Sequence, residues 1–133
     1  MKIRTDFVTN SSSSSFVIAR KEALTVDEVK KTLNKNCRDV IRNIIKVRNP
    51  NWLPEDIRRY VANNQMTEAV NAAIDYIAEE ITDFDCKDGL ELEDWYAFSC
   101  EFGDDGNLFT YFMYMYGGSR LSSENLKVKE TGY

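Results

Sequence analysis

Residues 25–48 read TVDEVKKTLNKNCRDVIRNIIKVR, and their apolar side chains recur at steps of three and four residues. That spacing is typical of one face of an amphipathic helix. Thr25 and Glu28 stand at the spacing of a capping box, in which the two side chains satisfy free N–H groups at the helix start. Asn49-Pro50-Asn51 ends the pattern. We therefore expect one continuous helix over 26–48, of about 22 residues. Its apolar stripe comprises Val26, Val29, Leu33, Cys37, Val40, Ile41, Ile44 and Val47.

Two more helices are expected after this one. Pro54, followed by Glu55 and Asp56, predicts the start of a short second helix, with proline in the first turn and acids at the positive end of the helix dipole. Thr67 is expected to cap a third helix. The apolar stripe of that helix comprises Val70, Ala73, Ile74, Ile77 and Ile81.

A serine block, Ser11–Ser15, lies between two runs of strand-forming residues near the start of the chain. Val, Ile, Phe and Thr favour strands, so we expect a hairpin with strands near 2–9 and 15–20. Serines readily form adaptable turns, and their simplest role is the connection. Two alternatives are an anion-binding or phosphorylated site and a serine nucleophile, which needs a base such as Lys2 or Lys21.

The residues around this block resemble the opening of many short, uncharacterised bacterial and phage proteins. Those proteins begin with a few basic residues and continue as F-V-[S/T]-N-S-S-S-S-S-F-[V/I]. The positions that fit are Lys2, Arg4, Phe7, Asn10, the five serines and Phe16, so the resemblance covers residues 1–18. It implies a bacterial or phage protein of the cytoplasm, and it carries over no catalytic residue because no activity belongs to the class.

Two aromatic runs, residues 95–102 and 108–116, follow the helices and predict a second hairpin. Gly103-Asp104-Asp105-Gly106-Asn107 between them is typical of a hairpin loop. A last short edge strand is expected over 126–129. Strands at both ends of the chain with about three helices between them predict an α+β two-layer sandwich. Its mainly antiparallel sheet would combine the two hairpins and carry the helices on one face.

Composition narrows the classes of function. The chain has 133 residues, of which 43% are apolar and 29% charged, and this predicts one globular domain over 1–133. It contains no histidine, which removes the commonest general base and metal ligand. Cys37, Cys86 and Cys100 form no C-x-x-C pair. No apolar run reaches the roughly 18 residues of a membrane span. We expect a cytoplasmic protein that neither associates with a membrane nor binds a metal or cofactor.

Charge is unevenly distributed along the chain. Residues 1–60 have a net charge of +6 and residues 61–106 a net charge of −12. The segment 79–105 holds eleven acids and one lysine, and it predicts an acidic surface that binds a basic partner. The alternative is an acidic surface that only keeps the protein in solution. The acids expected to contact a partner are Asp83, Asp85, Asp88, Glu91, Glu93 and Asp94.

The run 108–116 is aromatic or apolar on both faces of the expected strand. A strand covered on one side only alternates apolar and polar residues, so the second face also needs a cover. That cover is either the rest of the chain or a partner, including a second copy of the chain. Tyr111, Met113 and Met115 are the residues expected at such an interface.

Two alternatives concern nucleic acid and metal. Lys31, Lys35, Arg38 and Arg42 form a basic stripe on the helix expected over 26–48, and such a stripe can contact phosphates. An ordinary solvated helix face is the favoured interpretation, because amphipathic helices need charged outer faces. Residues 83–89 faintly resemble a calcium loop, but Lys87 replaces an acidic ligand and Gly89 comes one residue late. A divalent-metal site or a metal-dependent enzyme is therefore a third interpretation.

We expect a non-catalytic protein that binds another protein, such as an inhibitor or accessory factor of bacterial or phage origin. The acidic segment and the aromatic strand are the expected contact surfaces. Nucleic-acid binding is the main alternative.

Overall fold

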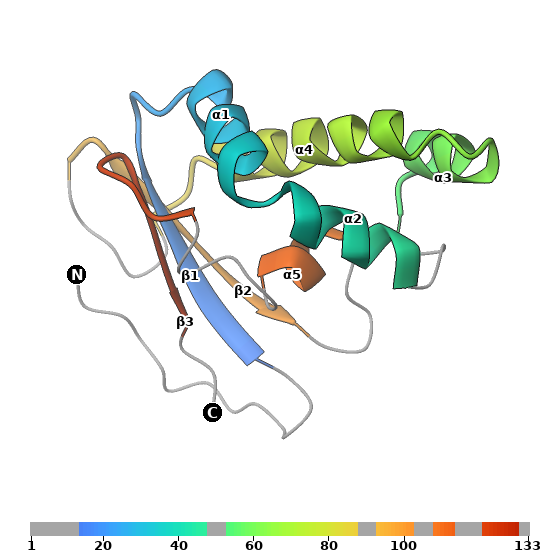
Figure 1. Cartoon of the computed structure of the whole chain (residues 1–133). Helices are drawn as coiled ribbons and strands as arrows, with labels where there is room; N and C mark the ends of the chain where they lie inside the picture. The colour runs from blue at the N-terminus through green and yellow to red at the C-terminus, as the bar shows by residue number, and fades with distance from the viewer. Residues whose placement is uncertain (1–13, 48–52, 88–92, 103–107, 114–120, 131–133) are drawn as a thin grey trace.

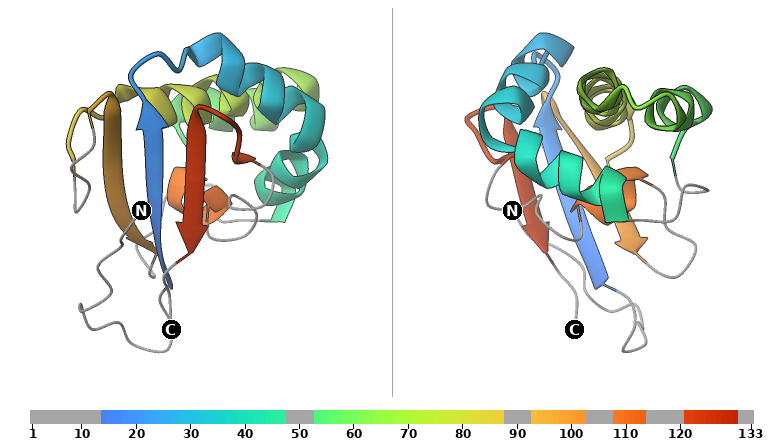
Figure 2. Two further views of the ribbon diagram at one scale, coloured as in Figure 1. Left: turned by 90° about the vertical axis from the view of Figure 1, so that its left-hand side faces the viewer. Right: turned by 45° about the vertical axis from the view of Figure 1, so that its right-hand side comes forward.

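The computed structural model describes residues 14–47, 53–87, 93–102, 108–113 and 121–130. In it, helices pack on one face of a three-stranded antiparallel sheet (Figure 1; Figure 2). The predicted α+β two-layer sandwich is therefore confirmed. The elements in chain order are β1 (Ser14–Lys21), α1 (Val26–Asn36), α2 (Arg38–Val47), α3 (Glu55–Ala62), α4 (Met66–Asp83), β2 (Trp95–Phe102), α5 (Leu108–Phe112) and β3 (Leu126–Glu130).

The first described strand, β1, occupies the centre of the sheet between β2 and β3. Lys21 pairs with Trp95, and Arg20 pairs with Leu126, both in antiparallel ladders. The end of β1 therefore lies beside the starts of β2 and β3.

The strands expected over 15–20, 95–102 and 126–129 are confirmed within one residue at each end. The expected strand at 2–9 lies outside the described residues, and so do Ser11–Ser13.

The two faces of the sheet carry different apolar clusters, because successive side chains of a strand alternate between faces. Ile18 of β1 belongs to the main core, which the helices cover. Val17, Ala19 and Ala97 form a smaller cluster on the opposite face, with Trp95 packed against it.

The long helix expected over 26–48 is interrupted, and the prediction of one continuous helix is wrong. Cys37 separates α1 from α2 with non-helical dihedral angles (φ −128°, ψ 1°). Its N–H still donates to the Leu33 carbonyl (2.9 Å), and its carbonyl accepts from the Ile41 N–H (3.0 Å). Asn36 and Cys37 favour the helix less than Lys or Leu does. The bend lets both helices turn apolar side chains to one core, where Leu33, Cys37 and Ile41 are 0% exposed.

A tight turn joins α3 to α4. Asn64 has left-handed dihedral angles (φ 59°), which asparagine tolerates better than most residues. The Gln65 N–H donates to the Tyr60 carbonyl (2.8 Å) and the Asn64 N–H to the Val61 carbonyl (3.0 Å). This Schellman arrangement satisfies the last carbonyls of α3 and reverses the chain, so that α3 packs against α4.

Helix α4 is the longest helix that the structure describes, and its buried stripe is the one the sequence predicts. It begins at Met66, directly after the turn, with Gln65 as the N-cap residue and no side-chain cap. Thr67 therefore lies inside the first turn, and the prediction that it caps the helix is wrong. The residues of the stripe are at most 1% exposed: Val70, Ala73, Ile74, Ile77 and Ile81.

The aromatic strand expected over 108–116 is also wrong, because residues 108–112 form the short helix α5. Helix α5 contacts α4 and β2, and it fills the space between the helices and the sheet. A short run that is apolar on every side suits a buried helical turn as well as a buried strand. β2 pairs with β1 instead of forming a hairpin with 108–116. The loop 103–107 and residues 114–116 lie outside the described residues.

Backbone contacts shield part of each edge strand. The Ser123 N–H donates to the Leu126 carbonyl of β3 (2.7 Å), and the Ala97 N–H of β2 donates to the Cys86 carbonyl (2.9 Å). These contacts occupy edge groups that could otherwise pair with another chain.

Candidate functional site

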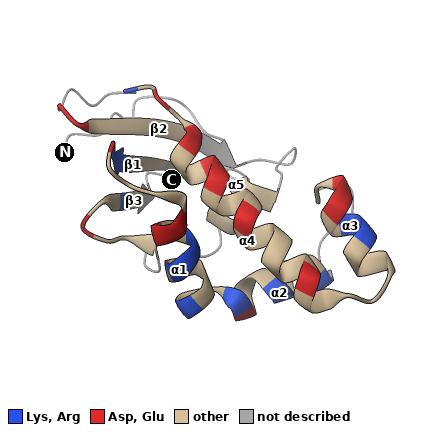
Figure 3. Cartoon of the chain, turned by 90° about the horizontal axis from the view of Figure 1, so that it is seen from above, with Lys and Arg blue, Asp and Glu red and all other residues tan. Residues whose placement is uncertain are grey.

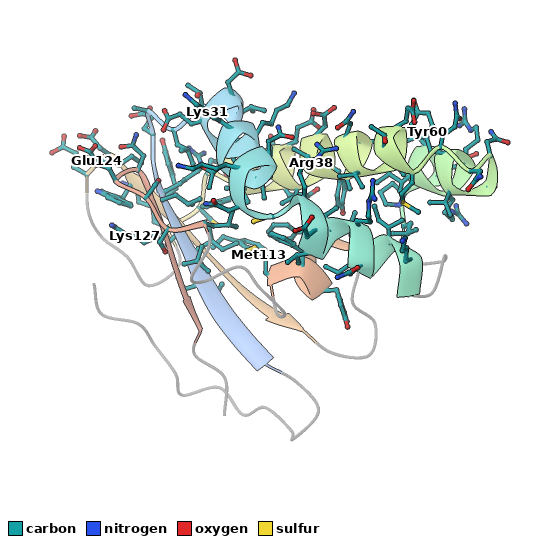
Figure 4. The ribbon with its side chains drawn as sticks, viewed as in Figure 1. Lys31, Arg38, Tyr60, Met113, Glu124 and Lys127 are labelled. Carbon is teal, nitrogen blue, oxygen red and sulfur yellow. The ribbon has the colours of Figure 1, made fainter. Side chains whose placement is uncertain are left out.

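Four exposed acids lie at one end of the sheet, although they come from three separate turns. Glu22 follows β1, Glu93 and Asp94 precede β2, and Glu124 precedes β3. The Glu22 N–H donates to the Asp94 carbonyl (2.8 Å). The Lys21 N–H donates to the carbonyl of Asn125, which follows Glu124 (2.9 Å). Figure 4 shows Glu124 at this end of the molecule, at the upper left.

The carboxyl end of α4 reaches the same end of the sheet. Phe84 follows the last residue of α4, and its carbonyl accepts a hydrogen bond from Arg20 at the end of β1. The acids of the last turns of α4 and of the residues after it therefore join the four turn acids. We call this set the acidic end, and all of its side chains are exposed: Glu22, Glu79, Glu80, Asp83, Asp85, Glu93, Asp94 and Glu124.

The electrostatics at the end of α4 are unfavourable to the folded protein. The last turn of α4 has no basic residue, and its acids lie at the negative end of the helix dipole. Partial burial raises the pKa of Glu80, and the negative charges of Asp83 and Glu79 raise it further. The same cluster acts on Tyr76, whose pKa is raised by burial and by Glu80. A cation bound here would relieve this repulsion.

We expect Glu80→Gln to stabilise the protein near neutral pH. When the pKa of a carboxyl is higher in the folded protein than in the unfolded chain, the free energy of unfolding falls as pH rises from the unfolded to the folded pKa. The variant removes that loss, so its advantage should fade below the ordinary glutamate pKa of 4.5. Urea denaturation of both proteins at several pH values measures it. The gain is small because water and salt screen an exposed charge. Equal stability of the two proteins at all pH values would contradict a raised pKa of Glu80 in the folded protein.

Two lysines that are close in sequence to acids of the acidic end, Lys21 and Lys87, each lie over an aromatic ring. The Lys21 Nζ is 5.8 Å from the centre of the Trp95 ring, and the Lys87 Nζ is 5.7 Å from that of Tyr96. Neither Glu80 nor Asp83 forms an ion pair within the part of the chain that the structure describes. The exposed carboxylates of Glu80 and Asp83 are therefore not neutralised by any described residue.

Arg20 is buried (8% exposed) beneath the acidic end. Its guanidinium carbon lies 5.0 Å from the centre of the Phe84 ring and 4.7 Å from that of Tyr96. It donates to the Phe84 carbonyl, at the negative end of α4, and no carboxylate of the described residues pairs with it. Among the described residues, its Nε has no hydrogen-bond partner. The helix end and the two rings thus stabilise this cation in place of an ion pair.

Some of the residues predicted to contact a partner are exposed at the acidic end, and others are buried in the core. Asp83, Asp85, Glu93 and Asp94 are exposed at the acidic end, whereas Asp88 and Glu91 lie outside the described residues. Tyr111 and Met113 are 7% and 4% exposed, and they pack in the main core. Figure 4 shows Met113 between the sheet and the helices. Placing these two side chains at an interface is therefore a wrong prediction, because α5 turns them inward, and Met115 lies outside the described residues.

The basic stripe is divided between two helices by the bend at Cys37. Lys31 and Lys35 are exposed on α1, and Arg42 is exposed on α2. Arg38 donates to Asn34 Oδ1 (2.7 Å) and Asn71 Oδ1 (3.0 Å), which fixes its guanidinium against α4. Figure 3 shows basic residues along α1 and α2 and acidic residues along α4. The basic residues thus lie on α1 and α2, which carry none of the acids of the acidic end.

The described side chains of residues 83–89 do not converge as the ligands of a calcium site would. Within the described ranges, no group of three or more Cys, Asp or Glu is arranged to hold a metal ion. Asp83 and Asp85 are exposed, and Asp88 lies outside the described residues.

Sequence reasoning missed Glu22 and Glu124, since neither belongs to the acidic segment 79–105. The signal was available in their positions, because each flanks an end of a predicted strand. Antiparallel pairing with β1 at the centre brings those ends together.

Among the described residues, no helix has the length and apolar character that a membrane crossing requires. Comparison with protein-family models, with curated proteins and with solved structures gives no match for this chain.

Proposed function

We propose that this chain is a non-catalytic protein of bacterial or phage origin that binds a basic surface of another protein through the acidic end. An inhibitor or accessory factor of the cytoplasm has this character, because it acts by occupying a surface. The carrying observation is the convergence of eight exposed carboxylates from four chain segments on one end of the fold.

The electrostatics support this function. Partial burial and the negative charges of Asp83 and Glu79 together raise the pKa of Glu80, so these carboxylates repel one another in the free protein. A cationic partner replaces the repulsion with attraction and is steered to the site over about one Debye length. Complementary charge of this kind favours fast and specific association.

Charge reversal tests the proposal. We expect Glu22→Lys with Glu124→Lys to reduce capture of a partner from cells of the source organism by about tenfold or more, because two attractive charges become repulsive. Glu55→Lys with Glu68→Lys is the matched control, since it makes the same change in net charge on α3 and at the start of α4. Captured proteins are identified and quantified by mass spectrometry at low and moderate salt.

Two results would count against the proposal. One is that the same proteins are captured equally by both double variants at either salt concentration. The other is that nucleic acid is captured and is lost when Lys35 and Arg42 become alanine, which would favour the basic face of α1 and α2.

A further inference from the structure

A pocket of about 200 Å³ opens between α1 and the start of β3. Its floor is apolar, since Leu24, Val29, Leu121 and Leu126 are at most 7% exposed. Its rim is polar. The polar residues that line it come from α1 and from the segment that leads into β3: Glu28, Lys31, Thr32 and Ser123.

Glu28 connects this pocket with the acidic end. The Thr25 hydroxyl accepts from the Glu28 N–H (3.2 Å), which is one half of the predicted capping box. The Glu28 carboxylate does not complete the other half; it accepts instead from the Asn125 side chain (3.1 Å). Asn125 follows Glu124, and its carbonyl accepts from the Lys21 N–H (2.9 Å). The carboxylate of Glu28 is therefore held at the pocket rim beside the acids of the sheet end.

The size and lining of the pocket restrict its occupant. A dry cavity of about 150 Å³ lined by Leu, Ile and Phe holds one benzene molecule, so 200 Å³ accommodates a single side chain of the size of leucine or phenylalanine. Protein interfaces commonly combine one such buried anchor with a polar rim. Lys31 also lines the pocket from α1 and repels cations, whereas the carboxylates of Glu28 and Glu124 attract them, so positive charges of a partner are directed toward Glu28 and Glu124.

We infer that the pocket receives one apolar side chain, of about leucine size, from a basic segment of the partner protein. The acidic end binds the Lys or Arg residues that flank this anchor. The inference rests on the proposed function and adds to it the chemistry of the segment that is recognised.

Two labelled peptides test the inference by fluorescence anisotropy. One has leucine at the centre of six Lys or Arg residues, and the other has alanine at that centre. We expect the protein to bind the leucine peptide about tenfold more tightly, because the anchor buries additional apolar area. Thr32→Phe fills the pocket from α1 and should remove this preference while leaving the weaker, charge-driven binding.

Two further variants control for folding and for added surface. Ser123→Phe fills the pocket from the opposite wall and should give the same result as Thr32→Phe. Asn43→Phe adds the same aromatic group to the exposed side of α2, away from the pocket, and should keep the preference.

The outcomes separate the inference from the proposed function. Equal binding of the two peptides by the unmodified protein, or a leucine preference that survives both pocket-filling variants, would overturn the pocket inference and leave the acidic end in place. Absence of binding to either peptide at low salt would contradict both.

Discussion

Replacing Phe112 with alanine is expected to lower the free energy of unfolding by about 3–5 kcal/mol, since a fully buried aromatic side chain is lost and a cavity remains. Phe112 is 0% exposed in α5, the helix that occupies the space between α4 and β2. A loss of this size is a large part of the 5–15 kcal/mol that stabilises a typical domain. Urea denaturation followed by circular dichroism measures it.

Val26→Ala provides the control, because Val26 is an apolar residue of α1 that is 36% exposed. Its cost should stay within about 0.5 kcal/mol. If Phe112→Ala were as mild as Val26→Ala, α5 would not be part of the core, and an exposed aromatic strand over 108–116 would again explain the sequence.

Removal of the buried cation is expected to have the second largest effect. Arg20→Ala should cost about 3 kcal/mol, because the Phe84 carbonyl loses its donor and the space between the rings of Phe84 and Tyr96 is emptied. The alanine variant no longer buries a charge, or an Nε without a hydrogen-bond partner among the described residues, and this gain offsets part of the loss.

Arg20→Met separates packing from charge. Methionine refills the space between the two rings but leaves the Phe84 carbonyl unpaired, so we expect a loss of about 1 kcal/mol. Thermal and urea denaturation of both variants give the comparison. If methionine were as damaging as alanine, the cation itself would provide most of the stability, contrary to a site in which packing dominates.

The sequence predicts well the elements whose pattern has a single physical explanation. β2 was expected over 95–102 and observed there, and α4 buries the residues of its three- and four-residue stripe. The interruption at Cys37 was missed because the apolar stripe continues through it; only the lower helix propensity of Asn36 and Cys37 indicates a break. The helix at 108–112 was missed because a short run that is apolar on every side fits two structures equally well.

The candidate site was only partly predictable for a different reason. Asp83, Asp85, Glu93 and Asp94 belong to one acidic segment, so their charge is visible in the sequence. The contribution of Glu22 and Glu124 depends on which strand is central, and the pocket depends on how α1 approaches β3. Both are properties of tertiary packing.

The central position of β1 has a consequence for the order in which this protein is made and folds. The described strand that is synthesised first must wait for both of its neighbours, since Ser14 pairs with Phe102 and Phe16 with Glu130. Pairings this distant in sequence slow folding. The helices of residues 26–83 can assemble locally while the chain emerges from the ribosome. Both edges of β1 stay unpaired until β2 is made, and one edge stays unpaired until β3 is made. Release of a chain truncated before β3 would therefore leave one edge of β1 open to aggregation.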